Sequence, residues 1–328
     1  MEIGKIPADL LEKLVIRPLT ENKKRSEVVI GPATGEDCSA VDMGNNLCVV
    51  SSDPITGADK DAGYLAVHIN CNDIASAGAE PIGILLTVML PPGTEEKTLT
   101  ELSAGARRAA DEINVEILGG HTEVTAAVNK PLISGTALGK VPKDNFVSTS
   151  GARPGQDIII TKWAGLEGTA VIAADNEKYL AEKLGSETVK AAMEFKSSIS
   201  VVKEALIAAK RGATCMHDAT EGGVMGAVWE VCSCSKCGCR LYKDDIPVRK
   251  ETEAIASLAG IDPLRLISGG TLIITAFEGE KLIAELSKNC IPAKIIGVIT
   301  DGRALEVSGT DEREIESPGA DELYKVKF

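Results

Sequence analysis

The sequence is poor in aromatic residues and in positive charge. Phe, Trp and Tyr make up 3% of the 328 residues, and 35 Lys and Arg stand against 48 Asp and Glu, which gives a formal net charge of -13. Nucleic-acid backbones attract basic surfaces, and single strands are held by stacking on aromatic side chains. The two shortages therefore argue against a nucleic-acid-binding protein. An acidic protein can still bind an anionic nucleotide when a bound cation reverses the local field.

Long apolar runs are also missing. The longest extends from Ile82 to Leu90, between Pro81 and Pro91, whereas a helix needs about 20 apolar residues to cross a bilayer. The first residues, MEIGKIPADLLEKL, carry charges where a signal peptide has its apolar segment. We therefore expect a cytoplasmic protein without a membrane segment. Its nine cysteines are expected to be reduced thiols.

The chain is long enough for about two domains. Strand-like apolar runs alternate with helix-like runs in both halves, which predicts two α+β lobes of similar size. Residues 142–155 are polar and include the sequence STSG before Pro154, which is typical of a connection between domains. We place the N-terminal lobe at 1–148 and the C-terminal lobe at 149–328.

The same patterns predict individual elements. Strands are expected at 47–52, 83–89, 115–118, 132–138, 157–161, 271–276 and 293–299. Helices are expected at 62–77, 95–113, 168–174, 197–210, 222–231, 251–259 and 279–288, and Thr94 is the expected N-cap of the second one.

Acidic residues stand beside glycines or other small residues at the ends of several predicted elements. A single aspartate beside glycine is usually a turn or a helix cap. However, Asp53 ends an apolar strand and Asp73 lies inside an apolar helix, where a carboxylate needs a partner such as a hard cation. Paired glycines let backbone N–H groups approach phosphate oxygens. The segments are GEDCS at 35–39, SSD at 51–53, ND at 72–73, GGHT at 119–122 and HDATEGG at 217–223.

The order and spacing of these segments are similar to those of the AIR synthase (PurM-like) superfamily. It includes aminoimidazole ribonucleotide synthetase (AIR synthase), thiamine monophosphate kinase, selenophosphate synthetase and the hydrogenase maturation protein HypE, and the resemblance looks closest to the HypE branch. The matching stretches are GEDCSAVD at 35–42, CNDIASAGAEP at 71–81, ILGGHTEV at 117–124, GTALG at 135–139, SGARPGQDIIIT at 150–161, HDATEGGV at 217–224 and SGGTLIIT at 268–275.

The resemblance implies a two-lobed fold, a homodimer built through strands of the N-terminal lobes, and ATP in a cleft near that interface. The apolar strand from Ile82 to Leu90, which needs cover on both faces, agrees with a dimer. The ATP contacts carried over to this sequence are Asn72, Gly119, Gly120, Thr122 and Asp218. The magnesium ligands carried over are Asp37, Asp53, Asp73 and Asp218, with His121 at a position where the family usually has aspartate.

His121 is the first departure from the family pattern. A histidine can bind a metal but supplies nitrogen and no negative charge. The alternative is that His121 makes a local hydrogen bond while the aspartates hold magnesium. Two other histidines, His68 and His217, lack a second nearby ligand in sequence and are expected to be hydrogen-bonded packing residues, with His217 lining the cleft.

The tail is the second departure. The HypE branch ends in a cysteine that carries a carbamoyl group on its way to cyanide, whereas the given sequence ends in ELYKVKF and its last cysteine is Cys290. We expect that this chain does not form cyanide on a terminal thiol. Selenophosphate synthetases carry a reactive cysteine or selenocysteine in an N-terminal loop, and here no cysteine precedes Cys38.

Four cysteines cluster in the C-terminal half as C-x-C-x2-C-x-C. Four thiolates could bind zinc or an iron–sulfur cluster. Reduced cysteines also pack as small apolar residues, and this interpretation is the one we favour for the cluster and for Cys38, Cys48, Cys71 and Cys215. The cluster consists of Cys232, Cys234, Cys237 and Cys239.

The sequence thus predicts an ATP- and Mg2+-dependent enzyme. Its expected reaction, by resemblance to AIR synthase and HypE, is phosphorylation of an amide- or carbonyl-type oxygen on a small-molecule or protein acceptor. One alternative is a small-molecule kinase similar to thiamine monophosphate kinase. Another is a nucleotide-binding maturation partner without chemistry of its own. The sequence identifies no catalytic nucleophile or base.

Overall fold

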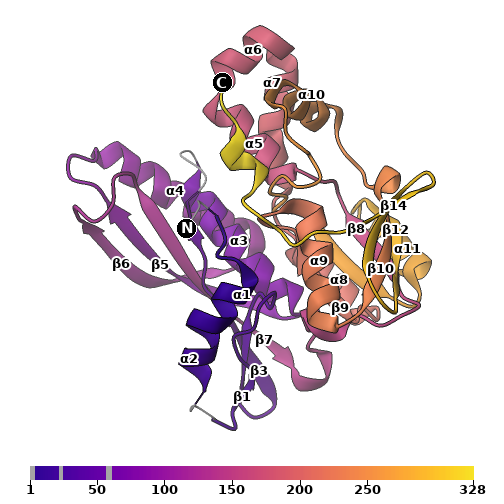
Figure 1. The fold of residues 1–328 in the computed structure, drawn as a ribbon. Coiled ribbons are helices and arrows are strands. Elements are labelled where there is room, and N and C mark those ends of the chain that lie inside the picture. The colour runs from indigo at the N-terminus through magenta and orange to yellow at the C-terminus, as the bar shows by residue number, and fades with distance from the viewer. Residues whose placement is uncertain (1–3, 22–24, 57–60) are drawn as a thin grey trace.

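The chain forms two lobes, each built on a seven-stranded sheet with helices packed on it (Figure 1). The computed structural model describes residues 4–21, 25–56 and 61–328. Because each lobe has its own sheet and core clusters, the predicted two-lobed α+β fold is confirmed. The first sheet ends in sequence at Pro142 and the second begins at Asp157, so the proposed boundary at 148/149 falls in the connection.

The first sheet has the strand order β1-β2-β3-β7-β5-β6, with the short β4 also paired to β7. Pairing is antiparallel except between β5 and β6, which run parallel. Its strands are β1 (Val28–Ile30), β2 (Ser39–Asp42), β3 (Asn46–Ser51), β4 (Pro54–Ile55), β5 (Glu80–Leu90), β6 (Glu116–Val124) and β7 (Leu132–Pro142).

Helix α3 (Ala62–Ser76) is the centre of the first lobe, and all of its residues are buried. It packs on β7 and on helix α4 (Glu96–Ile113), and it reaches helix α8 of the second lobe. The approach to α4 is close enough that a Cβ on Gly63 would lie 2.0 Å from the backbone oxygen of Leu102. Because α3 is buried on every side and contacts both lobes, it forms the floor between them.

The N-terminal segment forms a short chain of helical turns in front of the first lobe (Figure 1). These turns are α1 (Ala8–Leu11), the π-helix η1 (Glu12–Ile16) and α2 (Arg17–Thr20), and a 3-10 turn η2 (Lys143–Asn145) follows β7.

The second sheet has the order β14-β13-β10-β12-β8-β11-β9. Its strands are β8 (Asp157–Thr161), β9 (Cys215–Asp218), β10 (Gly238–Tyr242), β11 (Leu272–Ala276), β12 (Ala293–Thr300), β13 (Ala304–Ser308) and β14 (Asp311–Glu314). Its helices are α5 (Leu166–Asp175), α6 (Glu177–Leu184), α7 (Ser186–Met193), α8 (Val202–Lys210), α9 (Gly223–Ser235), α10 (Lys250–Ala259) and α11 (Gly279–Lys288), with 3-10 turns η3 (Thr149–Gly151), η4 (Glu194–Ser198), η5 (Lys243–Asp245) and η6 (Glu322–Lys325).

Most predicted elements are present, and two details were wrong. The helix predicted at 197–210 begins only at Val202, because η4 and a short connection after it come first. Helix α4 begins at Glu96 with Glu95 as its N-cap, and the hydroxyl of Thr94 instead donates to the backbone oxygen of Pro91 at 2.7 Å. The predicted strands at 115–118 and 132–138 extend to Val124 and Pro142 because β5 pairs with both.

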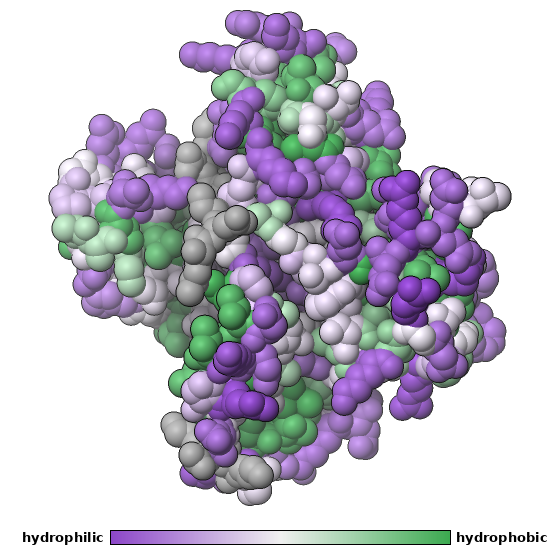
Figure 2. Space-filling model, in the orientation of Figure 1, coloured by the Kyte–Doolittle hydropathy of each residue, from purple (hydrophilic) through white to green (hydrophobic). Residues whose placement is uncertain are grey.

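One edge of the first sheet is open. All nine residues of β6 are exposed, Ile117, Leu118 and Val124 among them, and Ile82 and Leu85 of β5 add apolar surface. Figure 2 shows apolar surface over β5 and β6 at the outer end of the first lobe. The expected cover on both faces of the 82–90 strand is therefore not supplied within one chain.

No helix in the described part of the chain combines the length and the apolar character that a membrane span requires.

Candidate functional site

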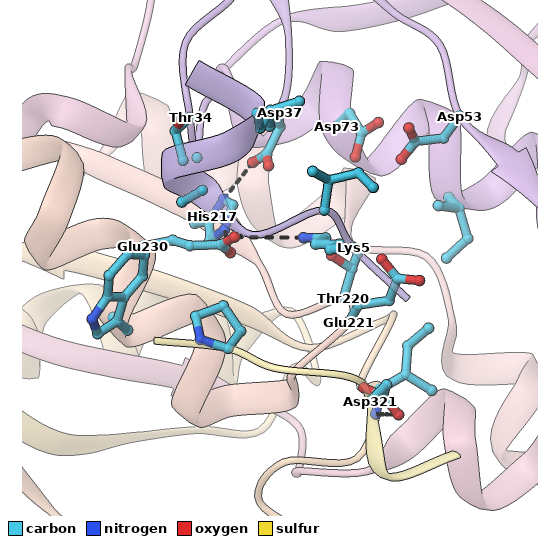
Figure 3. A pocket seen from close by; sticks show the side chains of 18 of the residues that line it. Lys5, Thr34, Asp37, Asp53, Asp73, His217, Thr220, Glu221, Glu230 and Asp321 are labelled. Carbon is cyan, nitrogen blue, oxygen red and sulfur yellow. Dashed lines mark hydrogen bonds and ion pairs between the residues drawn. The ribbon is translucent and has the colours of Figure 1, made fainter. Parts of the chain in front are cut away.

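A cavity of about 780 Å3 lies between the lobes. Its walls come from the segment Lys5–Leu11, the loop at 33–37, the end of β3 with β4, one side of α3, the β9–α9 region and the C-terminal stretch 317–324. This size falls within the range of small-molecule sites, about 300–1,000 Å3. Figure 3 shows acidic side chains from both lobes turned toward one another across it.

Three predicted aspartates line one side of the cavity, and a fourth lies just behind them. Asp37, Asp53 and Asp73 face the space, and Asp218 is 1% exposed at the end of β9. Burial, followed by the neighbouring carboxylates, raises the pKa of Asp73 well above its usual range, although the Ser51 hydroxyl donates to it at 2.6 Å. Burial also raises the pKa of Asp53. The structure thus collects negative charge from both lobes at one point.

Asp218 has an unusual environment. Within the described residues, neither of its carboxylate oxygens has a hydrogen-bond partner. Burial and the charge of Asp37 raise the pKa of Asp218 to about 8, with His217 acting in the opposite direction. An unpaired buried carboxylate is costly unless a proton or a cation neutralises it.

His217 bridges the lobes. Its Nδ1 lies 2.6 Å from Oδ2 of Asp37, and its Nε2 lies 2.8 Å from Oε2 of Glu230 (Figure 3). Burial acts to lower the pKa of His217, but Asp37 and Glu230 outweigh it and hold the pKa well above its usual value. Lys5 approaches the other oxygen of Glu230 at 3.5 Å. His217 is therefore a hydrogen-bonded cavity residue, as predicted, and Asp37 already has a partner.

The carboxylates fit a magnesium ion that is shared with phosphate. Within the described residues, no group of three or more His, Cys, Asp or Glu side chains converges into a ready metal cage. Magnesium does not need one, because it is usually held by one or two carboxylates, water and substrate phosphates. The unpaired oxygens of Asp218 and the mutual repulsion with Asp73 are what such an ion would relieve.

Asn72 is placed away from the cavity. Its amide nitrogen donates to the backbone oxygen of Ile199 at 2.8 Å, and its side-chain oxygen accepts from the backbone N–H of Val201 at 2.8 Å. Asn72 is fully buried and does not line the cavity. In this structure its amide joins α3 to the second lobe, which leaves no polar atom of the side chain free for a nucleotide.

The predicted glycine pair lies on the exposed strand β6, outside the cavity of its own chain. The pairing of β5 with β6 shifts register just before Gly119, which has a φ of 132°. A Cβ on Gly120 would lie 1.8 Å from the backbone oxygen of Leu86. The strand geometry alone therefore requires glycine at 120. Thr122 is exposed on the same strand, and Nε2 of the exposed His121 lies 3.3 Å from Glu123, which is a local contact.

The cysteines occupy mixed positions, and all nine are free thiols. Cys38, Cys71 and Cys215 are buried, as predicted, and Cys48 is half-buried. Cys232 and Cys239 belong to a core cluster of the second lobe, with Cys237 packed against it. Cys234 donates to the backbone oxygen of Thr34 at 3.1 Å, so it joins the second lobe to the loop that carries Asp37.

Sequence reasoning missed several cavity residues. Lys5, Glu167, Glu221 and Glu230 line the cavity, as does Asp321 near the C-terminal end. Glu221 was visible inside the HDATEGG segment, and Glu230 and Glu167 stand in otherwise apolar helices. A carboxylate in an apolar stretch is the signal that singled out Asp73, and it applied to these residues too.

Taken together, the chain has two lobes and an acidic cavity of small-molecule size between them, which is the architecture expected for the AIR synthase type. Two family models match it: AIR synthase related protein, N-terminal domain, over residues 35–141, and AIR synthase related protein, C-terminal domain, over 153–309. The chain belongs to the AIR synthase related family.

Relatives and similar folds agree. The chain is 30% identical over 271 residues to the carbamoyl dehydratase HypE of Cupriavidus necator, a match that covers 80% of this chain and 74% of that protein. A crystal structure of HypE in complex with ATP has a TM-score of 0.68 at 23% identity, over 98% of this chain and 97% of that one. Thiamine monophosphate kinase from Aquifex aeolicus has a TM-score of 0.72 at 18% identity, over 96% and 100%.

These comparisons confirm the predicted family, the fold and a functional class related to HypE and AIR synthase. The bound ATP is a property of the solved HypE structure. The homodimer, the magnesium ion and the individual site residues remain predictions.

Proposed function

We propose that this protein transfers the γ-phosphoryl group of ATP to an amide- or carbonyl-type oxygen of an acceptor held in the inter-lobe cavity. The observation that carries the proposal is the buried Asp218, whose two carboxylate oxygens have no partner within the described residues while Asp37, Asp53 and Asp73 stand close by. Such an uncompensated acidic site is suited to magnesium-bound phosphate and not to free phosphate.

In this proposal, Asp73 and Asp218 hold Mg2+ with Asp53 beside them. When bound, Mg2+ supplies positive charge that neutralises the phosphate oxygens of ATP. In Asp37, Oδ2 is engaged by the imidazole of His217 at 2.6 Å, so Oδ1 is the oxygen that would join the other carboxylates. Lys5, which reaches the cavity from the N-terminal segment, is the cation placed to approach a phosphate oxygen from the other side.

The transfer itself is a simple displacement. The acceptor oxygen forms a bond to the γ-phosphorus, the bond from that phosphorus to the β–γ bridging oxygen breaks, and ADP leaves with the bonding electron pair. The phosphorylated oxygen is then a good leaving group. The protein contributes mainly by positioning the two substrates and by excluding water from the buried wall of the cavity.

The proposal includes a homodimer. Strand β6 is an exposed sheet edge that carries the apolar side chains of Ile117, Leu118 and Val124, and such edges are usually covered. Gly119, Gly120 and Thr122 lie outside the cavity of their own chain, so we propose that they serve the phosphates from a second copy docked along β6. The acceptor can be a small molecule or a protein.

Titration calorimetry with ATP tests the proposal. Binding is expected to need Mg2+, and Asp73→Asn and Asp218→Asn are each expected to weaken it by about tenfold or more, because each removes a charged oxygen ligand. The matched control is Asp301→Asn on the exposed turn before β13. Equal binding of ATP with and without Mg2+ would refute the metal-bridged site.

Turnover of ATP separates the alternative functions. Turnover only with a phosphate-accepting hydroxyl compound would favour the small-molecule kinase. Tight binding of ATP without turnover with any acceptor would favour the non-catalytic partner.

A further inference from the structure

Glu167, in the first turn of α5, has an unpaired carboxylate oxygen inside the cavity. Its side chain is 7% exposed, and within the described residues its Oε2 has no hydrogen-bond partner. The carboxylate lies so close to Gly269 that a Cβ there would be 2.2 Å from Oε2. The carboxylate of Glu167 therefore fits only because position 269 is a glycine without a side chain.

The nearest charged groups are further acids. After burial, Asp321 and Glu221 raise the pKa of Glu167 to about 8, and a backbone hydrogen bond from Gly269 only partly opposes them. Asp321 accepts hydrogen bonds from the backbone N–H groups of Gly222, Ile267 and Leu323 at 2.7, 3.1 and 2.8 Å. Figure 3 shows Glu221 and Asp321 on the side of Lys5 opposite to Asp37, Asp53 and Asp73.

The basic groups near Glu167 are engaged elsewhere. Lys5 pairs with Glu230 at 3.5 Å. Behind Glu167 lies a second, smaller cavity that Asp61, Asp175 and Lys196 also line, and Lys196 donates to Asp61 at 2.8 Å. The charge of Lys5 does act to lower the pKa of Glu221, but the charged groups that act on Glu167 are the acids Asp321 and Glu221 alone. Among the described side chains, Glu167 therefore has no basic partner.

We propose that this end of the cavity is a subsite for a cationic nitrogen group of the acceptor, an ammonium, amidinium or guanidinium whose N–H groups donate to Glu167 and Glu221. The inference rests on the proposed function, because the acceptor and ATP share one cavity. The raised pKa of Glu167 agrees with it, since a bound cation would let this carboxyl ionise. The apolar side chains of Ile69, Val171 and Ile267 line the same cavity and would cover the carbon skeleton.

A pair of probes with nearly the same shape tests the charge requirement. Methylguanidinium is a cation, and N-methylurea is its neutral counterpart. Calorimetry on the full chain at pH 7 is expected to show saturable binding of methylguanidinium and at least about tenfold weaker binding of N-methylurea, because charged hydrogen bonds are the stronger ones. Equal binding of the two probes, or of neither, would overturn the proposal.

Glu167→Gln keeps the shape and removes the charge. We expect it to weaken methylguanidinium binding by about tenfold or more, whereas Glu251→Gln, at a glutamate equally buried but outside the cavity lining, is expected to leave binding unchanged. Unchanged binding in Glu167→Gln would contradict the subsite. If that variant is unfolded by circular dichroism, Glu221→Gln takes its place, with the same expected loss and the same contrary outcome.

Two measurements separate the remaining explanations. Binding at pH 7 measured in buffers of different ionisation enthalpy is expected to show proton release in wild type and none in Glu167→Gln. Displacement of methylguanidinium by one equivalent of K+ or Mg2+ would instead mean that the site binds an inorganic cation, which would refute the proposal. ATP–Mg2+ binding is measured separately without the probe, so failure of the subsite and failure of the ATP site can be told apart.

Discussion

His217 on β9 and Asp37 on the loop before β2 join the two lobes at the cavity, with Nδ1 of the imidazole 2.6 Å from Oδ2 of the carboxylate. The imidazole is 2% exposed, and its other nitrogen contacts Glu230 at 2.8 Å. Because the pKa of the imidazole is held well above its usual value, each ring nitrogen carries a proton, and one N–H donates to Asp37 of the first lobe while the other donates to Glu230 of helix α9. This contact fixes the separation of the lobes where the nucleotide is expected.

Replacing His217 is expected to destabilise the protein. His217→Ala would remove the partner of Asp37 and leave the buried Glu230 with Lys5 alone, at a cost on the order of 3 kcal/mol in the free energy of unfolding. His121→Ala is the matched control, because that imidazole is exposed on β6 and its loss is expected to cost less than about 0.5 kcal/mol. Urea unfolding followed by circular dichroism compares them, and equal midpoints would contradict the structural role of His217.

Asp218 is expected to make stability depend on pH. Its pKa is about 8 in the folded protein and about 3.9 when unfolded. Between these values the folded state retains a proton that the unfolded state releases, so the stabilisation is full below about pH 4 and is lost as the pH rises to about 8. Asp218→Asn should reduce the decrease in the free energy of unfolding between about pH 4 and pH 8. At pH 8.5 it should stabilise the nucleotide-free protein by an amount on the order of 2–5 kcal/mol.

Thermal unfolding of wild type and Asp218→Asn from pH 4 to pH 9 checks this expectation, with the exposed Asp301→Asn as control. Parallel curves for all three proteins would show that Asp218 is not a protonated acid in the nucleotide-free state. The gain in stability is expected together with a loss of ATP–Mg2+ binding, since the same unpaired oxygens are proposed to serve both.

A charge on β6 is expected to break the homodimer. Val124 is 64% exposed at the end of this strand, and a lysine on a sheet edge opposes pairing with another strand. Light scattering at micromolar concentration should give a dimer for wild type and for Phe277→Lys, an exposed apolar site in the second lobe. Val124→Lys should give a monomer with unchanged circular dichroism. A monomeric wild type would contradict the proposed dimer and the proposed role of the β6 glycines.

Asp321 is expected to hold the C-terminal stretch on the cavity. Asp321→Ala leaves the backbone N–H groups of Gly222 and Ile267 without their acceptor, at a cost of about 2 kcal/mol or more. Limited proteolysis should then cut first within 317–328, whereas Asp311→Ala on the exposed strand β14 should behave as wild type. Identical digestion patterns would mean that other contacts hold the stretch.

Local patterns predicted the regular elements well. The apolar run of β8 and the amphipathic helix α11 have the predicted bounds, because both are determined by side-chain periodicity over a few residues. Strand β9, with the sequence CMHD, was not predicted, since it is short and holds two polar residues that only burial makes strand-like. Helix α8 starts later than predicted because η4 comes first, and Asn72 of the other lobe accepts a hydrogen bond from the backbone N–H of Val201, which is the N-cap of α8.

The sequence by itself determined the family, the two-lobed fold and the presence of aspartates at segment ends, because motif order and spacing are properties of the chain. Only the tertiary structure decided how these residues are used. Asp37 meets His217 across 180 residues of sequence, Glu167 lies among acids brought from the β9–α9 turn and the C-terminal stretch, and the glycine pair lies on an outer sheet edge. The physical reason is that burial and charge pairing depend on how the two lobes pack in the folded chain. Local periodicity does not indicate which distant segments come into contact.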